Sequence, residues 1–275
     1  MKPFLIAQIS DPHVRPRGRL CYGRVDTAAH LARAVAEILA LPQHPDILVA
    51  TGDLVDAGRD EDYALLRELL EPLRIRTLLI PGNHDDRDAL RRVFADHPWL
   101  AGAAGDTAGP REIRYAIEDM PVRIVALDTV IPGEPGGRLS EESLDWLDRT
   151  LSARGDAPTV VIMHHPPFAT FIGHMDAMGL DNPAALAAVI SRHPQVQAVL
   201  CGHLHRSIQT RFAGTIAMTC PSTAHQVALD FASDAPDRYI MEPPGFMLHA
   251  WSAAAGLVSH AVPIGDFDGP YSFGD

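Results

Sequence analysis

Five short clusters of side chains that can bind metal ions are spaced along the sequence. The clusters are Asp11-Pro12-His13, Gly52-Asp53, Gly82-Asn83-His84-Asp85, His164-His165 and Gly202-His203-Leu204-His205. Each cluster alone has an ordinary explanation, because an aspartate can cap a turn and a histidine can pack in a core. However, each one directly follows an apolar run that is typical of a buried strand. This repeated placement is hard to reach by chance and favours one shared site.

The donor types indicate which metal ions and which chemistry the site would support. Carboxylate, amide oxygen and imidazole ligands favour divalent manganese, iron, cobalt or zinc, and no thiolate joins them to suggest a structural zinc. Two divalent ions bring four positive charges, from which Asp11, Asp53 and a bridging hydroxide subtract three. About one positive charge remains, which matches a phosphodiester monoanion. Two ions ~3.5–4 Å apart would clamp the attacking and leaving oxygens of an in-line displacement.

The elements that must position these clusters belong to an α/β fold. Apolar runs predict strands over residues 4–9, 46–50, 77–80, 115–117, 122–127, 159–163 and 198–200. Helices between them are predicted from apolar periodicity and from N-caps at Asp26 or Thr27, at Ser140 and at Asn182. The Gly/Ala-rich residues 101–112 predict a surface loop. In open α/β sheets, ligand sites form beyond the carboxyl ends of strands, where all five clusters are expected to meet.

Composition narrows the class of partner. The chain has 275 residues, 47% of them hydrophobic, which suffices for one large or two small globular domains. A formal charge of −12 disfavours a nucleic acid polymer, so an anionic ligand is expected to be small. No apolar run reaches the ~20 residues of a membrane span, and the first seven residues are too short for a secretory signal. Three cysteines without framework spacing fit a reducing, cytoplasmic setting.

The five clusters, in this order, resemble the signature of the calcineurin-like metallophosphoesterases over roughly residues 4–206. Within that superfamily the chain is similar to the bacterial glycerophosphodiesterase and class III cyclic-nucleotide phosphodiesterase branch. The segments that carry this similarity are residues 20–23, 81–86 and 221–226, which read Leu-Cys-Tyr-Gly, Pro-Gly-Asn-His-Asp-Asp and Pro-Ser-Thr-Ala-His-Gln. The resemblance implies a four-layer α/β sandwich with two central mixed β-sheets flanked by helices, followed by short C-terminal strands.

The same resemblance implies how the chain is divided. Residues 1–206 would form the metallophosphoesterase catalytic domain. Residues 207–275 would form a strand-rich extension that completes the sandwich and contributes to a cap and to a dimer interface. A homodimer or higher homo-oligomer is therefore expected.

The resemblance also assigns a role to each position of the site. The implied metal ligands are Asp11, His13 and His205 for one ion, Asn83, His164 and His203 for the other, and Asp53 for both. His84 would contact the phosphoryl oxygens and help protonate the leaving alkoxide, which makes Asp53 and His84 the catalytic residues. Asn83, His84 and His225 would bind substrate, and a hydroxide bridging the two ions would be the nucleophile.

Several nearby residues allow two interpretations. His165 follows a ligand on its strand, so its side chain is expected to face the other way in a supporting or core role, with catalysis as the alternative. Asp128 ends a strand outside every cluster, and a structural role is expected. His225 is either a substrate contact or a packed residue. The loop over residues 168–178 forms either a leaving-group pocket or core packing through Phe168, Phe171, Met175 and Met178.

The sequence therefore predicts a binuclear-metal-dependent phosphodiesterase that hydrolyses small phosphodiesters, such as cyclic nucleotides or glycerophosphodiesters. One alternative is a phosphomonoesterase or protein phosphatase, which the lack of an Arg-rich block to clamp a dianion disfavours. Another is a non-catalytic scaffold of the same fold, although such a protein would be expected to have lost metal ligands. The natural substrate and the metal identity stay open at this stage.

Overall fold

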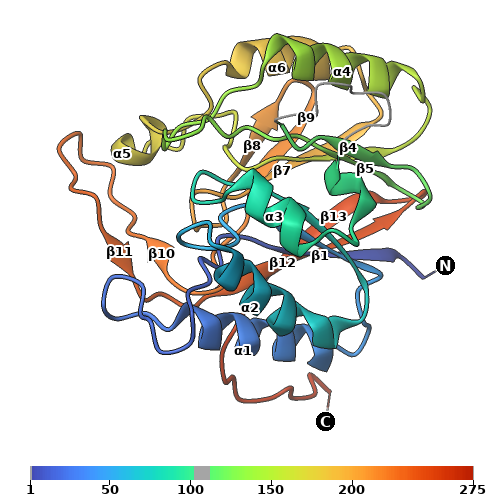
Figure 1. Ribbon diagram of the computed structural model, residues 1–275. Helices are drawn as coiled ribbons and strands as arrows, with labels where there is room; N and C mark the ends of the chain where they lie inside the picture. Colours follow the sequence, from blue (N-terminus) through green and yellow to red (C-terminus); the bar gives the residue numbers. More distant parts are fainter. Residues whose placement is uncertain (1, 102–111, 275) are drawn as a thin grey trace.

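The structure is a computed structural model that describes residues 2–101 and 112–274. Two β-sheets lie at its centre, with helices outside each of them (Figure 1). The first sheet contains, in spatial order, β13 (Gly256–Pro263), β12 (Gly245–Ser252), β1 (Phe4–Ile9), β2 (Ile47–Thr51) and β3 (Arg76–Ile80). The second contains β4 (Tyr115–Ile117), β5 (Arg123–Ala126), β6 (Thr159–Ile162), β7 (Val196–Cys201), β9 (Thr215–Thr219) and β8 (Gln209–Phe212). A separate pair consists of β10 (Gln226–Val227) and β11 (Tyr239–Ile240).

The helices form the outer layers. Near the first sheet lie α1 (Thr27–Ala40), α2 (Asp60–Leu70) with its 3-10 extension η1 (Glu71–Leu73), and α3 (Arg87–Val93), while α4 (Glu141–Ser152) and α6 (Pro183–Ile190) cover the second (Figure 1). The short α5 (Gly173–Asp176) and η2 (Pro98–Ala101) lie in connecting segments. Asp26 and Ser140 cap α1 and α4 by accepting from backbone N–H groups, as predicted. The predicted four-layer sandwich with two mixed sheets is confirmed.

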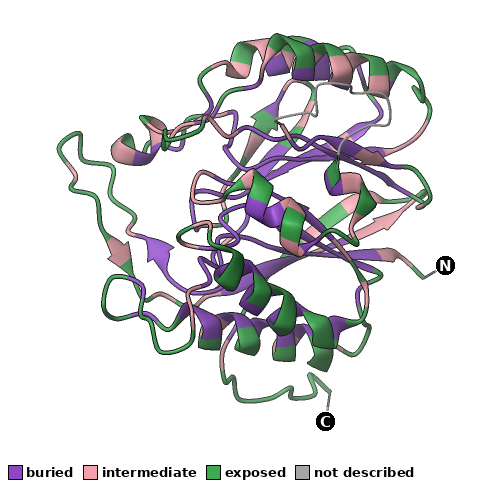
Figure 2. Cartoon of the chain, viewed as in Figure 1, coloured by how far each residue is buried: buried purple, intermediate pink, exposed green. Residues whose placement is uncertain are grey.

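The core explains why the sheets stay together. One apolar cluster joins residues of both sheets, among them Ile9, Ile162 and Leu200, and all three are almost fully buried. A second cluster lies between the second sheet and its helices, through Leu147, Leu186 and their neighbours. Figure 2 shows the central strands as buried, whereas the helices are buried on their inner side and exposed on the outer one. Burial on both faces gives these strands their continuous apolar runs.

The pairing of the strands determines where the polar clusters meet. Strands β1, β2 and β3 run parallel to one another, and so do β5, β6 and β7. Because parallel strands end at the same edge of a sheet, the segments that follow them lie at one end of the molecule. The observed strands differ from the predicted ranges by one or two residues at their ends. Most of the predicted loop at 101–112 falls on residues 102–111, which lie outside the described part of the chain.

The C-terminal strands are longer than the short strands predicted for this region. β12 and β13 form an eight-residue antiparallel pair, and β12 pairs antiparallel with β1. Residues 207–275 thus contribute strands to both sheets, while their treatment as a separate unit stays a prediction. Residues 265–274 carry neither helix nor strand. Within residues 2–101 and 112–274, no helix combines the length and apolar character that a bilayer crossing requires.

A buried histidine in β12 should make the fold sensitive to acid. The Nε2 of His249 lies 3.0 Å from Gln8 Oε1, and its Nδ1 lies 2.7 Å from Ser259 Oγ. Burial, with a smaller contribution from His260, lowers the pKa of His249 to about 3. The unfolded chain, with a histidine pKa of roughly 6.5, therefore binds a proton that the native state excludes. The contribution of neutral His249 to the free energy of unfolding is therefore fully present above pH ~6.5 and decreases as the pH falls below that value.

We expect His249→Gln to remove about 2 kcal/mol of the decrease in unfolding free energy that the wild type shows between pH 7 and pH 5. Urea unfolding at the two pH values measures this decrease. The matched control is His44→Gln, at an exposed histidine, which should behave as the wild type does. An identical decrease in the wild type and in His249→Gln would contradict this account.

Candidate metal centre

The carboxyl ends of the strands bring together the seven side chains that the sequence proposed as metal ligands. The first sheet positions Asp11, His13, Asp53 and Asn83, and the second positions His164, His203 and His205. All are buried except Asn83, which is half-buried. Their donor atoms face one another closely: His13 Nε2 lies 3.1 Å from His205 Nε2, and Asn83 Oδ1 lies 3.2 Å from His164 Nε2.

The carboxylate of Asp53 lies between two groups of donors. Its Oδ2 is 3.6 Å from His13 Nε2 and 3.5 Å from His164 Nε2. On the His13 side, Asp11, His13 and His205 have donor atoms within 4.8 Å of one another. The other carboxylate oxygen, Oδ1, accepts a 2.9 Å hydrogen bond from the backbone N–H of His84. Asp53 is thus placed where one carboxylate could serve two cations.

Contacts outside this group orient the imidazoles. The Nδ1 of His164 lies 2.8 Å from the carbonyl oxygen of Thr51, and the Nδ1 of His205 lies 2.9 Å from the carbonyl oxygen of His225. A carbonyl can only accept, so each Nδ1 carries the proton and each Nε2 lone pair faces the other donors. The buried Nε2 of His203 has no hydrogen-bond partner in the described part of the chain. A buried nitrogen without a partner is costly and fits a position that a cation would complete.

The backbone at these residues is unusual. Five of them have a positive φ, a conformation that costs a residue other than glycine about 1–2 kcal/mol. They are Asp11 (51°), His13 (42°), Asp53 (47°), His203 (71°) and His205 (51°). Asp11, Asp53 and His203 lie two residues after a strand, and His13 and His205 lie four residues after one. Such concentrated strain is typical of functional sites.

Three glycines make room for this arrangement. A Cβ at Gly52 would collide with the ring of His164, and one at Gly82 would collide with both Asp53 Oδ1 and the Asp53 backbone nitrogen. A Cβ at Gly202 would collide with Ser10 Oγ and the Thr51 carbonyl. The glycines that begin these three clusters thus let neighbouring backbones approach closely enough for donors from different strands to meet.

Electrostatics leave three of the donors, Asp53, His203 and His205, in forms that bind cations. Burial raises the pKa of Asp53, but the nearby imidazoles of His164 and His13 outweigh it and hold that pKa well below its usual range. Burial lowers the pKa of His203 well below the usual histidine value and also lowers that of His205. Metal binding requires an ionised carboxylate beside neutral imidazoles. Burial lowers the pKa of His164, but the Asp53 carboxylate outweighs it and raises that pKa to about 9, so His164 has to release a proton when a cation binds. Burial raises the pKa of Asp11, which shows how strongly this enclosed site needs positive charge.

His84 and His225 flank the donor group. The ring of His84 meets the ring of His13 edge-on, with centroids 4.6 Å apart, and its side chain is 36% exposed. The ring of His225 lies 4.8 Å from that of His205, and its buried Nδ1 has no hydrogen-bond partner in the described residues. Both residues line a cavity of about 450 Å³ in front of the metal-binding donors.

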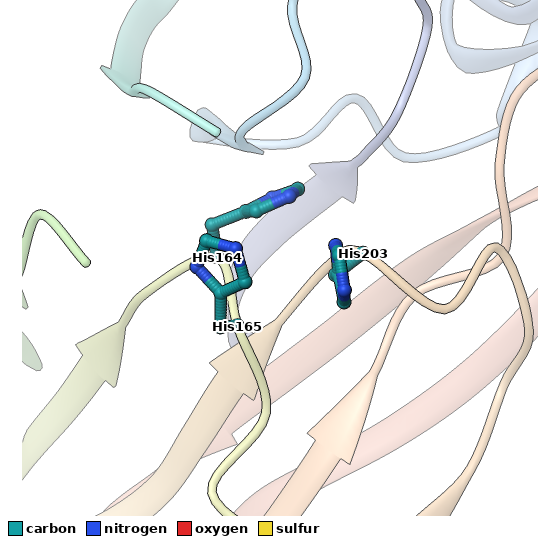
Figure 3. A group of neighbouring side chains, drawn as sticks. All are labelled: His164, His165 and His203. Carbon is teal, nitrogen blue, oxygen red and sulfur yellow. The ribbon is translucent and has the colours of Figure 1, made fainter. Parts of the chain in front are cut away.

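His165 does not face away from the group, so that expectation is wrong. Its ring centroid is 4.8 Å from that of His164 and 4.6 Å from that of His203 (Figure 3). Strand β6 ends at Ile162, so the alternation of a strand no longer applies two residues later. Its Nδ1 lies 2.8 Å from Thr129 Oγ1, and its Nε2 lies 3.1 Å from the Pro135 carbonyl. With both nitrogens engaged, His165 supports its neighbours, in line with the expected supporting role.

In the loop over residues 168–178, some side chains line the cavity and others pack against the core, so each of the two interpretations holds for part of the loop. Met175 and Met178 line the cavity, whereas Phe168 packs against the core of the second sheet. Phe171 does neither and is 76% exposed. The remaining apolar wall of the cavity consists of Tyr22, Pro135, Val227 and Tyr239.

Sequence reasoning missed Asp56 and the role of Asp85. Asp56 Oδ1 lies 3.7 Å from His13 Nδ1. No motif of the sequence analysis included Asp56, although it follows Asp53 by three residues. The half-buried carboxylate of Asp85 accepts hydrogen bonds from the N–H groups of Leu54 and Gly82 and from the hydroxyl of Tyr63. Asp85 therefore binds its own loop to the loop that carries Asp53. The sequence feature that could have indicated this role is the position of Asp85 directly after Asn83 and His84.

Comparisons with known proteins agree with this geometry. Residues 4–207 match the family model described as calcineurin-like phosphoesterase. A protein of Arcobacter nitrofigilis named "Probable glycerophosphodiester phosphodiesterase GpdQ" is 38% identical over 271 residues, covering 98% of this chain and 97% of the relative. A cAMP/cGMP dual specificity phosphodiesterase of Mycobacterium tuberculosis is 32% identical, covering 84% of this chain and 70% of the relative.

The fold also has a close match among solved structures. The crystal structure of a dimetal phosphatase from Danio rerio superposes with a TM-score of 0.65 at 16% sequence identity. The match covers 96% of this chain and all of the other one. At this level of identity the likeness concerns the fold alone.

Adding a methyl group at Gly82 should disrupt the metal centre without unfolding the protein. In Gly82→Ala the new Cβ displaces Asp53, so we expect the variant to bind much less than wild-type metal after dialysis against Mn(II). Elemental analysis measures the metal content, and circular dichroism checks the fold. Gly155→Ala is the matched control, because a Cβ there meets no atom within 4 Å. Full metal occupancy in Gly82→Ala would argue against a role for Asp53 in binding.

Proposed function

Because the chain belongs to the calcineurin-like phosphoesterase family, we propose that it hydrolyses small phosphodiesters, either glycerophosphodiesters or cyclic nucleotides, with the help of two bound metal ions. The observation that carries the proposal is the position of Asp53, whose Oδ2 lies within 3.6 Å of both His13 Nε2 and His164 Nε2. Relatives named for these two substrate classes align with most of the chain, which supports the choice of substrates.

In this proposal the donors divide into two sets that share one carboxylate. Asp11, His13 and His205 would hold one ion, Asn83, His164 and His203 the other, and Asp53 both. Oxygen and imidazole donors suit manganese, iron, zinc or cobalt. When bound, the ions would stabilise the charge of the phosphoryl group and lower the pKa of the attacking water.

His84 is the proposed proton donor for the leaving alkoxide. Its Nδ1 lies 3.1 Å from the Asp56 carbonyl, which only accepts, so this nitrogen carries a proton and fixes the ring. Burial lowers the pKa of His84, but the carboxylates of Asp53 and Asp56 outweigh it and raise that pKa, which favours the charged imidazole. In this form Nε2 carries a second proton, which could pass to the leaving alkoxide in the cavity that His84 lines. Side chains placed in this way to transfer a proton contribute about 10²–10⁴-fold to rate.

Two further groups would orient the substrate. The Oδ1 of Asn83 faces His164, so its amide nitrogen is directed elsewhere and can donate to a phosphoryl oxygen. His225 also lines the cavity, where its ring could contact the substrate. Beyond them, the leaving group would lie against the apolar wall that Tyr239 and Met175 help to form, with Arg238 also lining the cavity.

We also propose that the chain self-associates through the arm formed by β10, β11 and the loop between them. The arm extends away from the two sheets (Figure 1). It exposes large apolar side chains, namely Leu229, Phe231, Ile240 and Met241. A two-stranded ribbon is marginally stable by itself, and a second copy would cover both the ribbon and these side chains.

The unpaired, buried cysteines suit the cytoplasm, which is the proposed compartment.

The diesterase activity is testable directly. Protein loaded with Mn(II) is expected to cleave bis(p-nitrophenyl) phosphate, and Asp53→Asn, which removes the shared negative charge, should abolish turnover. A panel of cyclic AMP, glycerophosphoethanolamine and glycerophosphocholine then identifies the preferred class. Much faster cleavage of p-nitrophenyl phosphate than of the diester would point to a phosphomonoesterase. A folded protein that takes up no metal would point to a scaffold.

The role of His84 predicts a dependence on the leaving group. His84→Ala should lower kcat by about 10²–10⁴-fold on a glycerophosphodiester, whose alkoxide is a strong base that needs a proton. The decrease should be much smaller on bis(p-nitrophenyl) phosphate, because nitrophenolate leaves without protonation. Equal decreases on the two substrates would show that His84 acts by another route.

A further inference from the structure

A buried ion pair outside the metal centre connects the two sheets. The Nε of Arg87 lies 2.6 Å from Asp128 Oδ2, and its Nη2 lies 2.8 Å from Asp128 Oδ1. The same Nη2 donates to the Val130 carbonyl at 2.7 Å. The side chain of Asp128 is fully buried, and that of Arg87 is 13% exposed. The two-point geometry fixes both direction and distance, which a single charge contact would not do.

The pair joins elements that lie on opposite sides of the site. Asp128 follows β5 in the second sheet, and its oxygens also accept from the backbone N–H groups of Ile113 and Val130. Arg87 is the first residue of α3 and comes directly after the loop over residues 81–86, which begins at the end of β3. That loop carries Asn83, the one proposed ligand that is not buried. Asn83 therefore depends on its loop for its position.

The same loop is also fixed to the first sheet, through Asp85. Asp85 accepts from Leu54 N at 3.0 Å and from the Tyr63 hydroxyl at 2.8 Å. The Tyr63 hydroxyl in turn accepts from the backbone N–H of Asp86 at 2.9 Å. On the C-terminal side of Asn83, the loop is thus held to the first sheet by Asp85 and to the second sheet by Arg87, two and four residues after Asn83.

We propose that Arg87 and Asp128 form a positioning pair that sets the distance between Asn83 and His164, and thereby holds together one of the two metal positions. This inference rests on the proposed function, because it assumes two ions. The other position has its own connections across the sheets. Asp11 Oδ1 accepts from the His203 backbone N–H at 3.0 Å, and the Asp11 carbonyl accepts from Ser222 Oγ at 2.8 Å.

The ordinary alternative is that the pair only stabilises the fold. Buried ion pairs are weak evidence for stability, because desolvation offsets most of their attraction. The two roles differ in what a variant loses. A purely stabilising pair would affect both metal positions alike through general loosening, whereas a positioning pair affects the position completed by Asn83 and spares the other.

The test compares Mn(II) binding to metal-free wild type, Arg87→Lys and Asp128→Asn by isothermal titration. Arg87→Lys keeps the charge and loses the two-point geometry, so it should fold even if Asp128→Asn does not. The control is Arg67→Lys, in the exposed Arg67–Asp96 pair, which is also held at two points, through Nη1 and Nη2 at 2.6 and 2.7 Å. That pair connects α2 to the segment after α3 and lies outside the second sheet.

Wild type and Arg67→Lys should bind two ions with two distinct dissociation constants. In Arg87→Lys one dissociation constant should rise 10- to 100-fold and the other should stay within about twofold, because outer contacts of metal ligands have effects of this size. Unchanged constants, or an equal rise in both, would overturn the inference. A wild type that binds fewer than two ions would instead overturn the proposed function.

Discussion

The structure depends on one constraint, which is that two separate sheets must deliver donors to the same small volume. Asp11, Asp53 and Asn83 come from the first sheet, and His164, His203 and His205 from the second. Neither sheet alone provides enough ligands for a pair of cations. The apolar cluster that joins the sheets therefore sets the geometry of the site as well as the stability of the fold. A shift of one sheet relative to the other would separate donors from different sheets that now lie 3.1–3.6 Å apart.

This constraint explains why so many unfavourable features gather at the strand ends. Left-handed residues, buried carboxylates and an unpartnered imidazole each oppose folding of the metal-free chain. They persist because the surrounding backbone is held by close glycine contacts and by the hydrogen bonds of Asp85. Cations bound at the site would relieve most of this cost, so metal uptake and stability should be coupled.

Much of this arrangement was predictable from the sequence, because strand-end clusters follow from simple periodicity. Asp53 and His164 could be assigned to one site since each follows a continuous apolar run, and the parallel sheets bring such ends together. Local rules failed where the strand had already ended, as at His165, whose direction is set by Thr129 and Pro135 rather than by alternation. They also gave no partner for Asp128, because Arg87 lies 41 residues away and the pairing exists only in the assembled fold. Nothing in the local pattern of β12 showed that it would pair with β1.

The division between the donor group and its surroundings also bears on the choice of substrate. Relatives named for a glycerophosphodiester and for cyclic nucleotides both align with this chain, so residues around the donors have to separate these substrates. In this chain the distal wall comes from segments that belong to neither central sheet, namely Tyr22 before α1, Met175 in α5 and Tyr239 in β11. Such segments can change without disturbing the core, because they do not set the distance between the sheets. The donors that would carry out hydrolysis are thus physically separate from the residues that line the distal wall of the cavity. Substrate preference should therefore depend on the residues of that wall.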